Sequence, residues 1–190
     1  ERDALTALTT LDDEGRARYR KTIAEPRVTV LDLLDAYPSC NLEFAQFLDM
    51  LPPLRPRYYS ISSAPTENGA CHITVGVLDA PARGRDGRFA GVCSTHLRGS
   101  EVDGTVFTFV RKPTIPFTPP ENPHIPMIMV GARTGMAPFR GFLQERAALK
   151  RRGVPIAESL LFFGCRTPDQ DFLYADELRA FERDGVVKLC

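Results

Sequence analysis

One short stretch of this 190-residue chain places a cation, two aromatic rings and a hydroxyl in succession, at Arg57, Tyr58, Tyr59 and Ser60. Successive side chains of a strand point to opposite faces, so the two rings would lie on different sides. Arginine suits a phosphate, a tyrosine ring stacks on a flat heterocycle, and a serine hydroxyl reaches a polar ring edge. The stretch could hold an anionic aromatic cofactor, although tyrosine-rich strands with an exposed arginine are also common in ordinary antiparallel sheets.

A second stretch, Gly91, Val92, Cys93 and Ser94, has the composition of a helix start. The first backbone N–H groups of a helix lack intrahelical partners and can bind an anion. Most such starts are plain caps, so this pattern alone allows both interpretations.

A third pattern begins with an apolar run at 125–130, followed by the turn Gly131-Ala132-Arg133-Thr134-Gly135 and a helix with Pro138 in its first turn. A strand, a glycine-containing turn and a helix N-terminus together form a dinucleotide phosphate loop. A second apolar run at 159–163 ends before Cys165 and Arg166.

Four motifs occur in one order and resemble the FAD and NADPH module of the diflavin reductases, within the ferredoxin–NADP reductase superfamily. They are Arg57-x-Tyr59-Ser60, Gly91 to Ser94, Gly131 to Gly135 followed by Ala137-Pro138-Phe139-Arg140, and Phe163 to Arg166. The run from Leu31 to Cys40 leans towards the bacterial self-sufficient cytochrome P-450 monooxygenase fusions.

The resemblance implies roles that spacing alone does not. Arg57 would bind the FAD pyrophosphate, Tyr59 would stack on the isoalloxazine, and Ser60, the one catalytic side chain, would lie near flavin N5. The other FAD residues would be Tyr58, Thr74, Val75, Gly76, Gly91, Val92, Cys93 and Ser94. The NADP residues would be Gly131, Arg133, Thr134, Gly135, Cys165 and Arg166. Arg133 departs from the family pattern, which has glycine there, so it would either obstruct the nucleotide or attract a phosphate.

The elements that must position these residues predict an α+β chain in three parts. Residues 1–54 form a helical connecting segment, 55–120 an antiparallel β-barrel part that binds FAD, and 121–190 the truncated start of a doubly wound α/β domain that binds NADP. Asp12 begins one helix, Thr29 and Asp32 form a capping box, and Asn41 caps a helix with Leu42, Ala45, Leu48 and Leu51 inward.

In the second part we expect strands at 57–62, 72–78 and 105–110, and a mobile loop over 79–90. In the third part the strand at 125–130 should be buried on both faces. It should be followed by a helix from Pro138, a strand at 159–163, a helix over 171–181 and a strand at 186–189. Asp169, Asp171, Tyr174 and Glu177 continue the resemblance, and the carboxylates of this later helix are otherwise expected on a solvated face.

Composition narrows the function further. Lysine plus arginine and aspartate plus glutamate are 24 each, which disfavours a nucleic-acid surface, and no apolar run has the length of a membrane span. The five cysteines are scattered without metal-ligand spacing, so reduced thiols and a cytoplasmic location are expected. No metal is predicted. Glu1 and the strand-like end at Cys190 suggest a fragment.

The resulting hypothesis is a reductase module in which FAD takes hydride from NADPH and passes electrons to FMN and then to a haem. The FMN-binding flavodoxin-like domain and the haem domain would lie in the same parent chain. Two alternatives stay open: a truncated domain without catalytic activity, and a stand-alone reductase of the sulfite reductase or nitric oxide synthase type. The choice of NADP over NAD depends on the resemblance alone.

Overall fold

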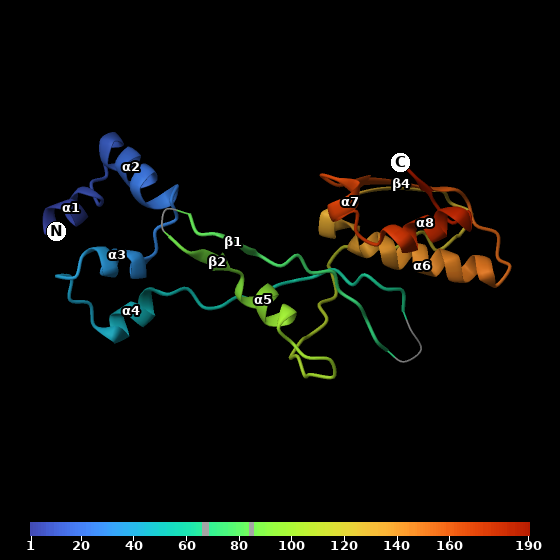
Figure 1. The fold of residues 1–190 in the computed structure, drawn as a ribbon, viewed down its shortest axis with the longest axis horizontal. Coiled ribbons are helices and arrows are strands. Elements are labelled where there is room, and N and C mark those ends of the chain that lie inside the picture. The colour runs from blue at the N-terminus through green and yellow to red at the C-terminus, as the bar shows by residue number, and fades with distance from the viewer. Residues whose placement is uncertain (66–68, 84–85) are drawn as a thin grey trace. The chain divides into compact units, whose positions relative to one another are not determined.

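The computed structural model describes residues 1–65, 69–83 and 86–190 (Figure 1). Its contacts divide the chain into two units. The first contains Glu1–Pro56 and Val77–Gly99, and the second contains Arg57–Gly76 and Ser100–Cys190. This division differs from the boundaries predicted at 54 and 120, which stay a prediction. Each unit is described by itself.

The first unit begins with short helices, as predicted for residues 1–54. They are α1 (Arg2–Ala7), α2 (Asp13–Tyr19), the π-helix η1 (Arg20–Ala24), α3 (Val30–Ala36) and α4 (Phe44–Met50). The carboxylate of Asp12 accepts from the Gly15 N–H at 2.7 Å, which satisfies one free donor at the start of α2. Thr29 and Asp32 form the predicted capping box of α3.

The prediction for the last of these helices was wrong in two respects. Glu43 precedes α4, so Asn41 is not its cap. Ala45, Leu48 and Leu51 are exposed, and Leu42 is half-buried. Seven residues make only two helical turns, and such a helix buries an apolar face only where another element packs on it.

The predicted loop over 79–90 contains a short hairpin. Strands β1 (Asp79–Pro81) and β2 (Arg88–Ala90) pair antiparallel, and residues 84–85 between them lie outside the described residues. Arg88 donates to the Asp79 carboxylate at 2.7 Å across this pair. Helix α5 (Val92–Arg98) follows, with Gly91 as its N-cap residue, as predicted.

In the second unit, the predicted antiparallel strands are largely absent from the described residues. Segments 57–62 and 72–78 pair only at the bridge between Ile61 and Ile73, where the Ser62 N–H donates to the His72 carbonyl at 2.7 Å. Residues 105–110 form no strand, and Phe107 is 98% exposed. A two-stranded pairing without a covered hydrophobic face is marginal, so the barrel expected here is not formed by these segments.

The α/β part has the predicted strand and helix order. The parallel sheet contains β3 (Met127–Ala132), β4 (Ser159–Gly164) and β5 (Lys188–Leu189), in that spatial order. Between the strands lie the 3₁₀ turn η2 (Arg133–Met136), α6 (Ala137–Arg151), α7 (Pro168–Asp171) and α8 (Ala175–Arg183). Pro138 lies in the first turn of α6, where its missing N–H has no partner to lose.

Only one face of this sheet is covered, contrary to the prediction for β3. Met127 and Met129 are buried under α6 and α8, which lie on the same side of the sheet (Figure 1), whereas Ile128 is 73% exposed. The strand order runs in one direction, and right-handed crossovers then put both helices on one face.

The helix predicted over 171–181 is two helices. Tyr174 separates α7 from α8 and has φ of 60°, a left-handed conformation that a helix interior cannot contain. In the part of the chain that the structure describes, no helix is long and apolar enough to cross a bilayer.

Candidate cofactor site

Tyr58 and Tyr59, predicted to lie on opposite sides of a strand, differ in their surroundings. The Tyr58 ring is exposed, meets Phe109 edge to face with centroids 6.1 Å apart, and lies 5.1 Å below the Arg111 guanidinium. Tyr59 is half-buried, and Ser60 and Arg57 are exposed. The Tyr58 ring is thus engaged by Phe109 and Arg111.

The second flavin segment reaches the nucleotide part of the same unit. Thr74 Oγ1 and the Tyr174 hydroxyl are 2.6 Å apart, and Val75 is half-buried. A Cβ placed on Gly76 would lie 3.6 Å from Cγ2 of Thr134. The structure therefore brings a predicted FAD residue against a predicted NADP residue.

Gly91 to Ser94, the remaining predicted FAD residues, lie in the first unit. The Ser94 hydroxyl accepts from the Leu78 N–H at 3.1 Å and donates to the Gly91 carbonyl at 3.2 Å. A Cβ on Gly91 would lie 2.8 Å from that hydroxyl, so the turn requires glycine. Ser94 is buried and holds the turn, while Val92 is exposed and Cys93 half-buried.

At the carboxyl end of β3, the two glycines of the turn from Gly131 to Gly135 differ in the space around them. A Cβ on Gly131 would lie 3.2 Å from the Phe139 ring, whereas one on Gly135 would meet no atom within 4 Å. Arg133 has φ of 50°, the conformation that favours the glycine of the resembled family. Arg133, Thr134 and Gly135 are all exposed.

The segment after β4 is tied to the same edge of the sheet. The Asp171 carboxylate accepts from the N–H groups of Arg166 and Thr167, each at 3.0 Å. These hydrogen bonds, with the charges of Arg133 and Arg166, hold the pKa of Asp171 below its ordinary value. Cys165 is half-buried beside them. The charged side chains of Arg133 and Arg166 and the turn from Gly131 to Gly135 thus lie at one edge of the sheet.

The residues at this edge fit a dinucleotide. The open space at Gly135 lets phosphate oxygens approach the backbone, and the 15-residue helix α6 starts directly after the turn. The exposed side chains of Arg133 and Arg166 add positive charge. For a flavin, the half-buried Tyr59 and the exposed Ser60 supply a ring face and a hydroxyl.

Sequence reasoning did not predict a role for Arg140, whose side chain has several partners far away in the sequence. It donates to the Glu177 carboxylate at 2.6 Å and to the Ser62 carbonyl at 2.9 Å. Glu177 was expected on a solvated face, but its side chain is only 28% exposed and pairs with Arg140. The motif that contains Arg140 was recognised, yet nothing local in it indicates partners 37 and 78 residues away.

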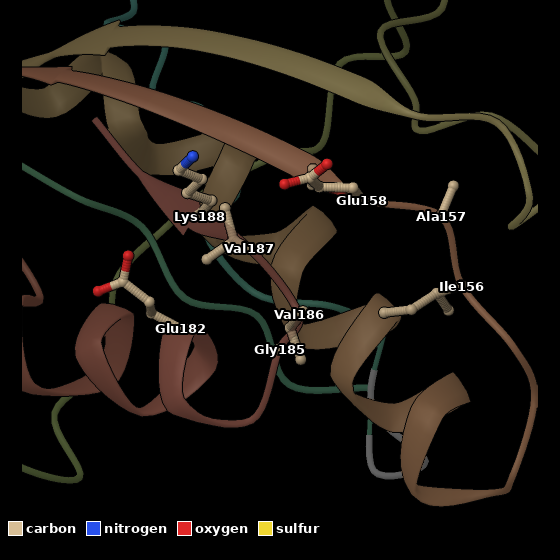
Figure 2. A pocket seen from close by; sticks show the side chains of 9 residues that line it. Ile156, Ala157, Glu158, Glu182, Gly185, Val186, Val187 and Lys188 are labelled. Atoms are coloured by element: carbon tan, nitrogen blue, oxygen red, sulfur yellow. The ribbon is translucent and has the colours of Figure 1, made fainter.

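A hollow of about 440 Å³ lies at the opposite edge of the sheet, where β4 and β5 begin. Figure 2 shows Glu158, Glu182 and Lys188 around it. One Glu182 oxygen accepts from the Leu189 N–H at 2.9 Å. Ligands of such sheets bind at the carboxyl ends of the strands, so this hollow is not the dinucleotide site.

Comparison with known proteins agrees with the site. The family described as FAD binding domain matches residues 1–96, and the family described as oxidoreductase NAD-binding domain matches residues 129–186. These matches define an oxidoreductase module with an FAD-binding part followed by a nicotinamide-dinucleotide-binding part.

Three relatives are fusion proteins. The bifunctional cytochrome P-450/NADPH–P-450 reductase 1 of Bacillus subtilis is 48% identical over 170 residues, which cover 89% of this chain and 16% of that protein. Its Bacillus cereus counterpart is 45% identical over 172 residues, covering 90% and 16%. A self-sufficient cytochrome P-450 monooxygenase of Phanerodontia chrysosporium is 44% identical over 174 residues, covering 90% and 16%.

The chain belongs to the FAD-binding reductase family that includes the NADPH–P-450 reductase part of these fusions. The predicted family, the reductase class and the cofactors FAD and NADPH are thereby confirmed at the level of the family. The chain spans about one sixth of the length of these relatives, since the matches cover 16% of each.

Proposed function

We propose that this chain is the NADPH-oxidising part of a larger electron-transfer protein that ends in a haem monooxygenase. Bound FAD would accept a hydride from NADPH at N5, releasing NADP⁺, and would pass the two electrons singly to FMN and then to the haem. The FMN-binding flavodoxin-like domain and the haem domain would belong to the same protein. The names of the relatives, a bifunctional cytochrome P-450/NADPH–P-450 reductase and a self-sufficient cytochrome P-450 monooxygenase, support this assignment.

The observation that carries the proposal is the proximity of Gly76 to the nucleotide turn, since a Cβ added to Gly76 would lie 3.6 Å from Cγ2 of Thr134. Hydride transfer requires the reacting atoms of the two rings to lie about 3–3.5 Å apart. A flavin segment that ends against the nucleotide turn can bring the rings together. A protein that only binds FAD, or only binds a dinucleotide, does not need this proximity.

Different residues would bind the FAD pyrophosphate and orient the isoalloxazine ring. Within the second unit, Arg57 would bind the FAD pyrophosphate, and Tyr59 would stack on the isoalloxazine. In the first unit, the turn from Gly91 to Ser94 would offer backbone N–H groups to an FAD phosphate. Thr74, Val75 and Gly76 would line the ring through backbone and small side-chain contacts. Tyr58, whose ring already packs on Phe109, would support the strand rather than the ring.

The nucleotide residues would act at the carboxyl edge of the sheet. The backbone from Gly131 to Gly135 and the N-terminus of α6 would hold the pyrophosphate of NADPH. Arg166 would add a charged contact, and Cys165 would lie beside the nicotinamide nucleotide. Arg133 would obstruct the approach of NADPH to the turn, because its Cβ and aliphatic side chain occupy a position where the family has glycine.

Ser60 would hold a hydrogen bond near N5 and is the proposed catalytic side chain. Loss of one positioned donor commonly lowers a rate about 10²–10³-fold. In the full-length protein, Ser60→Ala should keep FAD bound and slow the reduction of the flavin by NADPH in stopped flow. Reduction at the parental rate would exclude this role.

The overall proposal is tested by titrating FAD into the purified chain and by mixing the full-length, FAD-loaded protein with NADPH. Stoichiometric FAD and bleaching of the flavin band support the reductase. A folded protein that takes up no FAD would instead support a domain without catalytic activity. Reduction of the flavin without reduction of a haem in the same protein would support a stand-alone reductase.

A further inference from the structure

Arg140 is surrounded by partners from the flavin segments and from α8. Its side chain is only 13% exposed, its Nε donates to Glu177, and its Nη1 donates to the Ser62 carbonyl. Nη1 also lies 3.3 Å from Nδ1 of His72, and since arginine has only donors, that nitrogen must be the acceptor. The guanidinium carbon lies 4.5 Å from the centre of the Tyr174 ring, which orients it further.

Two neighbours on α6 contact the same flavin segment. The amide oxygen of Gln144 accepts from the Ala64 N–H at 3.0 Å, while its amide nitrogen donates to Glu177 at 2.7 Å. A Cβ on Gly141 would lie 3.0 Å from the Ser63 carbonyl oxygen. Gly141 therefore allows the backbone to approach the helix closely, and Gln144 fixes its position along the helix.

The other flavin segment is held from α8. The Tyr174 hydroxyl lies 2.6 Å from Thr74 Oγ1, and the Tyr174 ring lies against the Arg140 guanidinium. Tyr174 adopts φ of 60°, a strained conformation that persists only where the surroundings impose it. Its two contacts explain why the chain keeps this conformation.

We propose that Arg140, Gly141, Gln144, Tyr174 and Glu177 form a docking surface, here called the α6–α8 surface, that sets the position of the flavin segments over the nucleotide turn. Arg140 is its positioning residue, since it contacts both segments and both helices. The proposal rests on the proposed function for its catalytic consequence. It assigns the surface no direct contact with FAD or NADPH.

The surface can control hydride transfer because it holds the same segments that contain Ser60 and Gly76. Ser62 and Ala64 follow Ser60 by two and four residues, and Thr74 precedes Gly76 by two residues. A displacement of about 1 Å at a reacting pair can cost about 10²-fold in rate. The planar guanidinium fork makes contacts in fixed directions that a lysine ammonium does not reproduce.

The first experiment needs no cofactor. Hydrogen exchange is measured on the purified 190-residue chain and on its Arg140→Met variant. The proposal expects at least tenfold faster exchange at the Ser62 and Ala64 amides in the variant, and unchanged exchange in β3 and β4. Arg179→Met is the matched control, because Arg179, on α8, lies over the Phe172 ring and pairs with Asp176, and among the described residues these contacts involve neither flavin segment. It should leave exchange at Ser62 and Ala64 at the parental rate.

The second experiment uses the full-length protein loaded with FAD. Arg140→Met should lower the rate of flavin reduction at saturating NADPH about tenfold or more, with little change in FAD content or in KM for NADPH. Arg140→Lys should recover only part of the rate, and Arg179→Met should match the parent. A rate loss with unchanged segment exchange would overturn the positioning role, as would faster exchange with an unchanged rate.

If Arg140→Met does not fold, Gly141→Ala and Glu177→Gln keep the proposal testable. Gly141→Ala should displace the Ser63 carbonyl and slow flavin reduction, and Glu177→Gln keeps the shape of its partner while removing the charge. Parental exchange and parental rates in both variants would refute the α6–α8 surface. A parent protein that binds FAD but is not reduced by NADPH would instead refute the proposed function, while the exchange result would still decide the docking.

Discussion

Two regions of the second unit have strand-like sequences, the earlier segments 57–62, 72–76 and 105–110 and the later region 127–189, but only the later region forms a sheet. Met127 to Ala132 pair fully with Ser159 to Gly164, whereas segments 57–62 and 72–78 share one bridge. Leu161 in the later region has no exposed surface, while Phe107 in the earlier one is almost fully exposed. The two regions thus differ in burial rather than in strand-like composition.

The two regions differ in where along the chain their strand-pairing and core-packing partners lie. In a β-α-β unit, the crossover helix returns the chain to the next strand and covers the sheet, so about 35 consecutive residues supply both the pairing and the core. An antiparallel barrel strand needs neighbours on both sides and a filled interior. Within the described residues, segments 57–62 and 105–110 have neither.

The largest predicted effect tests this difference in burial. Leu161→Ala removes a fully buried side chain from the core of the α/β part and should lower its free energy of unfolding by about 2–5 kcal/mol. Phe107→Ala, at a 98% exposed position, should change it by less than about 0.5 kcal/mol. Urea unfolding followed by circular dichroism measures both, and equal losses would erase the contrast between the two regions.

The second prediction concerns strain in the well-formed region. Arg133→Gly removes a left-handed arginine whose strain is of order 1–3 kcal/mol, offset by about 0.4–1 kcal/mol from the freer unfolded chain. A net stabilisation of about 1 kcal/mol is expected, with tighter NADPH binding in the full-length protein.

Arg133→Lys is the control, since it keeps the Cβ and the charge and should bind NADPH like the parent. Calorimetric titration measures both variants. Weaker binding by Arg133→Gly would make the guanidinium a phosphate ligand rather than an obstruction.

The third prediction tests whether Tyr59, in the poorly paired region, stacks on the flavin ring. Tyr59→Ala should weaken FAD retention in the full-length protein by about 0.5–1.5 kcal/mol beyond the loss of buried area, and should shift the flavin absorption band. Tyr58→Phe keeps the packing on Phe109 and should retain FAD like the parent. An unchanged affinity and spectrum in Tyr59→Ala would place the flavin ring elsewhere.

The smallest effect is a pH dependence at the nucleotide edge. The pKa of Asp171 is lowered in the folded chain by hydrogen bonds from Thr167 and Arg166, so its stabilising contribution is fully present above its unfolded pKa of about 3.9. That contribution is lost as the pH falls from there through the folded pKa. The amide signals of Arg166 and Thr167 should therefore shift in NMR spectra as the pH falls from about 5 into the acid range.

Asp171→Ala should abolish those amide shifts, whereas Asp169→Ala, a change at a neighbouring exposed carboxylate, should retain them. Amide signals that stay constant in the parent down to acid would show that Asp171 does not hold the segment after β4.

The sequence by itself determined the features that depend on neighbouring residues. Asp12 and Thr29 indicate where their helices begin, because a capping side chain accepts a hydrogen bond from the backbone N–H three residues later. The strand, glycine turn and Pro138 start of α6 are likewise local. The motifs were sufficient to identify the family, because several short patterns in one order are far more specific than any of them alone.

Tertiary structure decided the features that depend on distant residues. The one-sided cover of β3 follows from strand order, which the apolar run at 125–130 does not contain. Glu177 does not lie on the solvated face expected for it, because Arg140, 37 residues earlier in the sequence, packs beside it. Thr74 and Tyr174 meet across 100 residues of sequence, and the left-handed turn at Tyr174 is held by that meeting. Tertiary packing determines side-chain partners that lie so far apart in the sequence, because neither local propensity nor hydrophobic periodicity contains information about them.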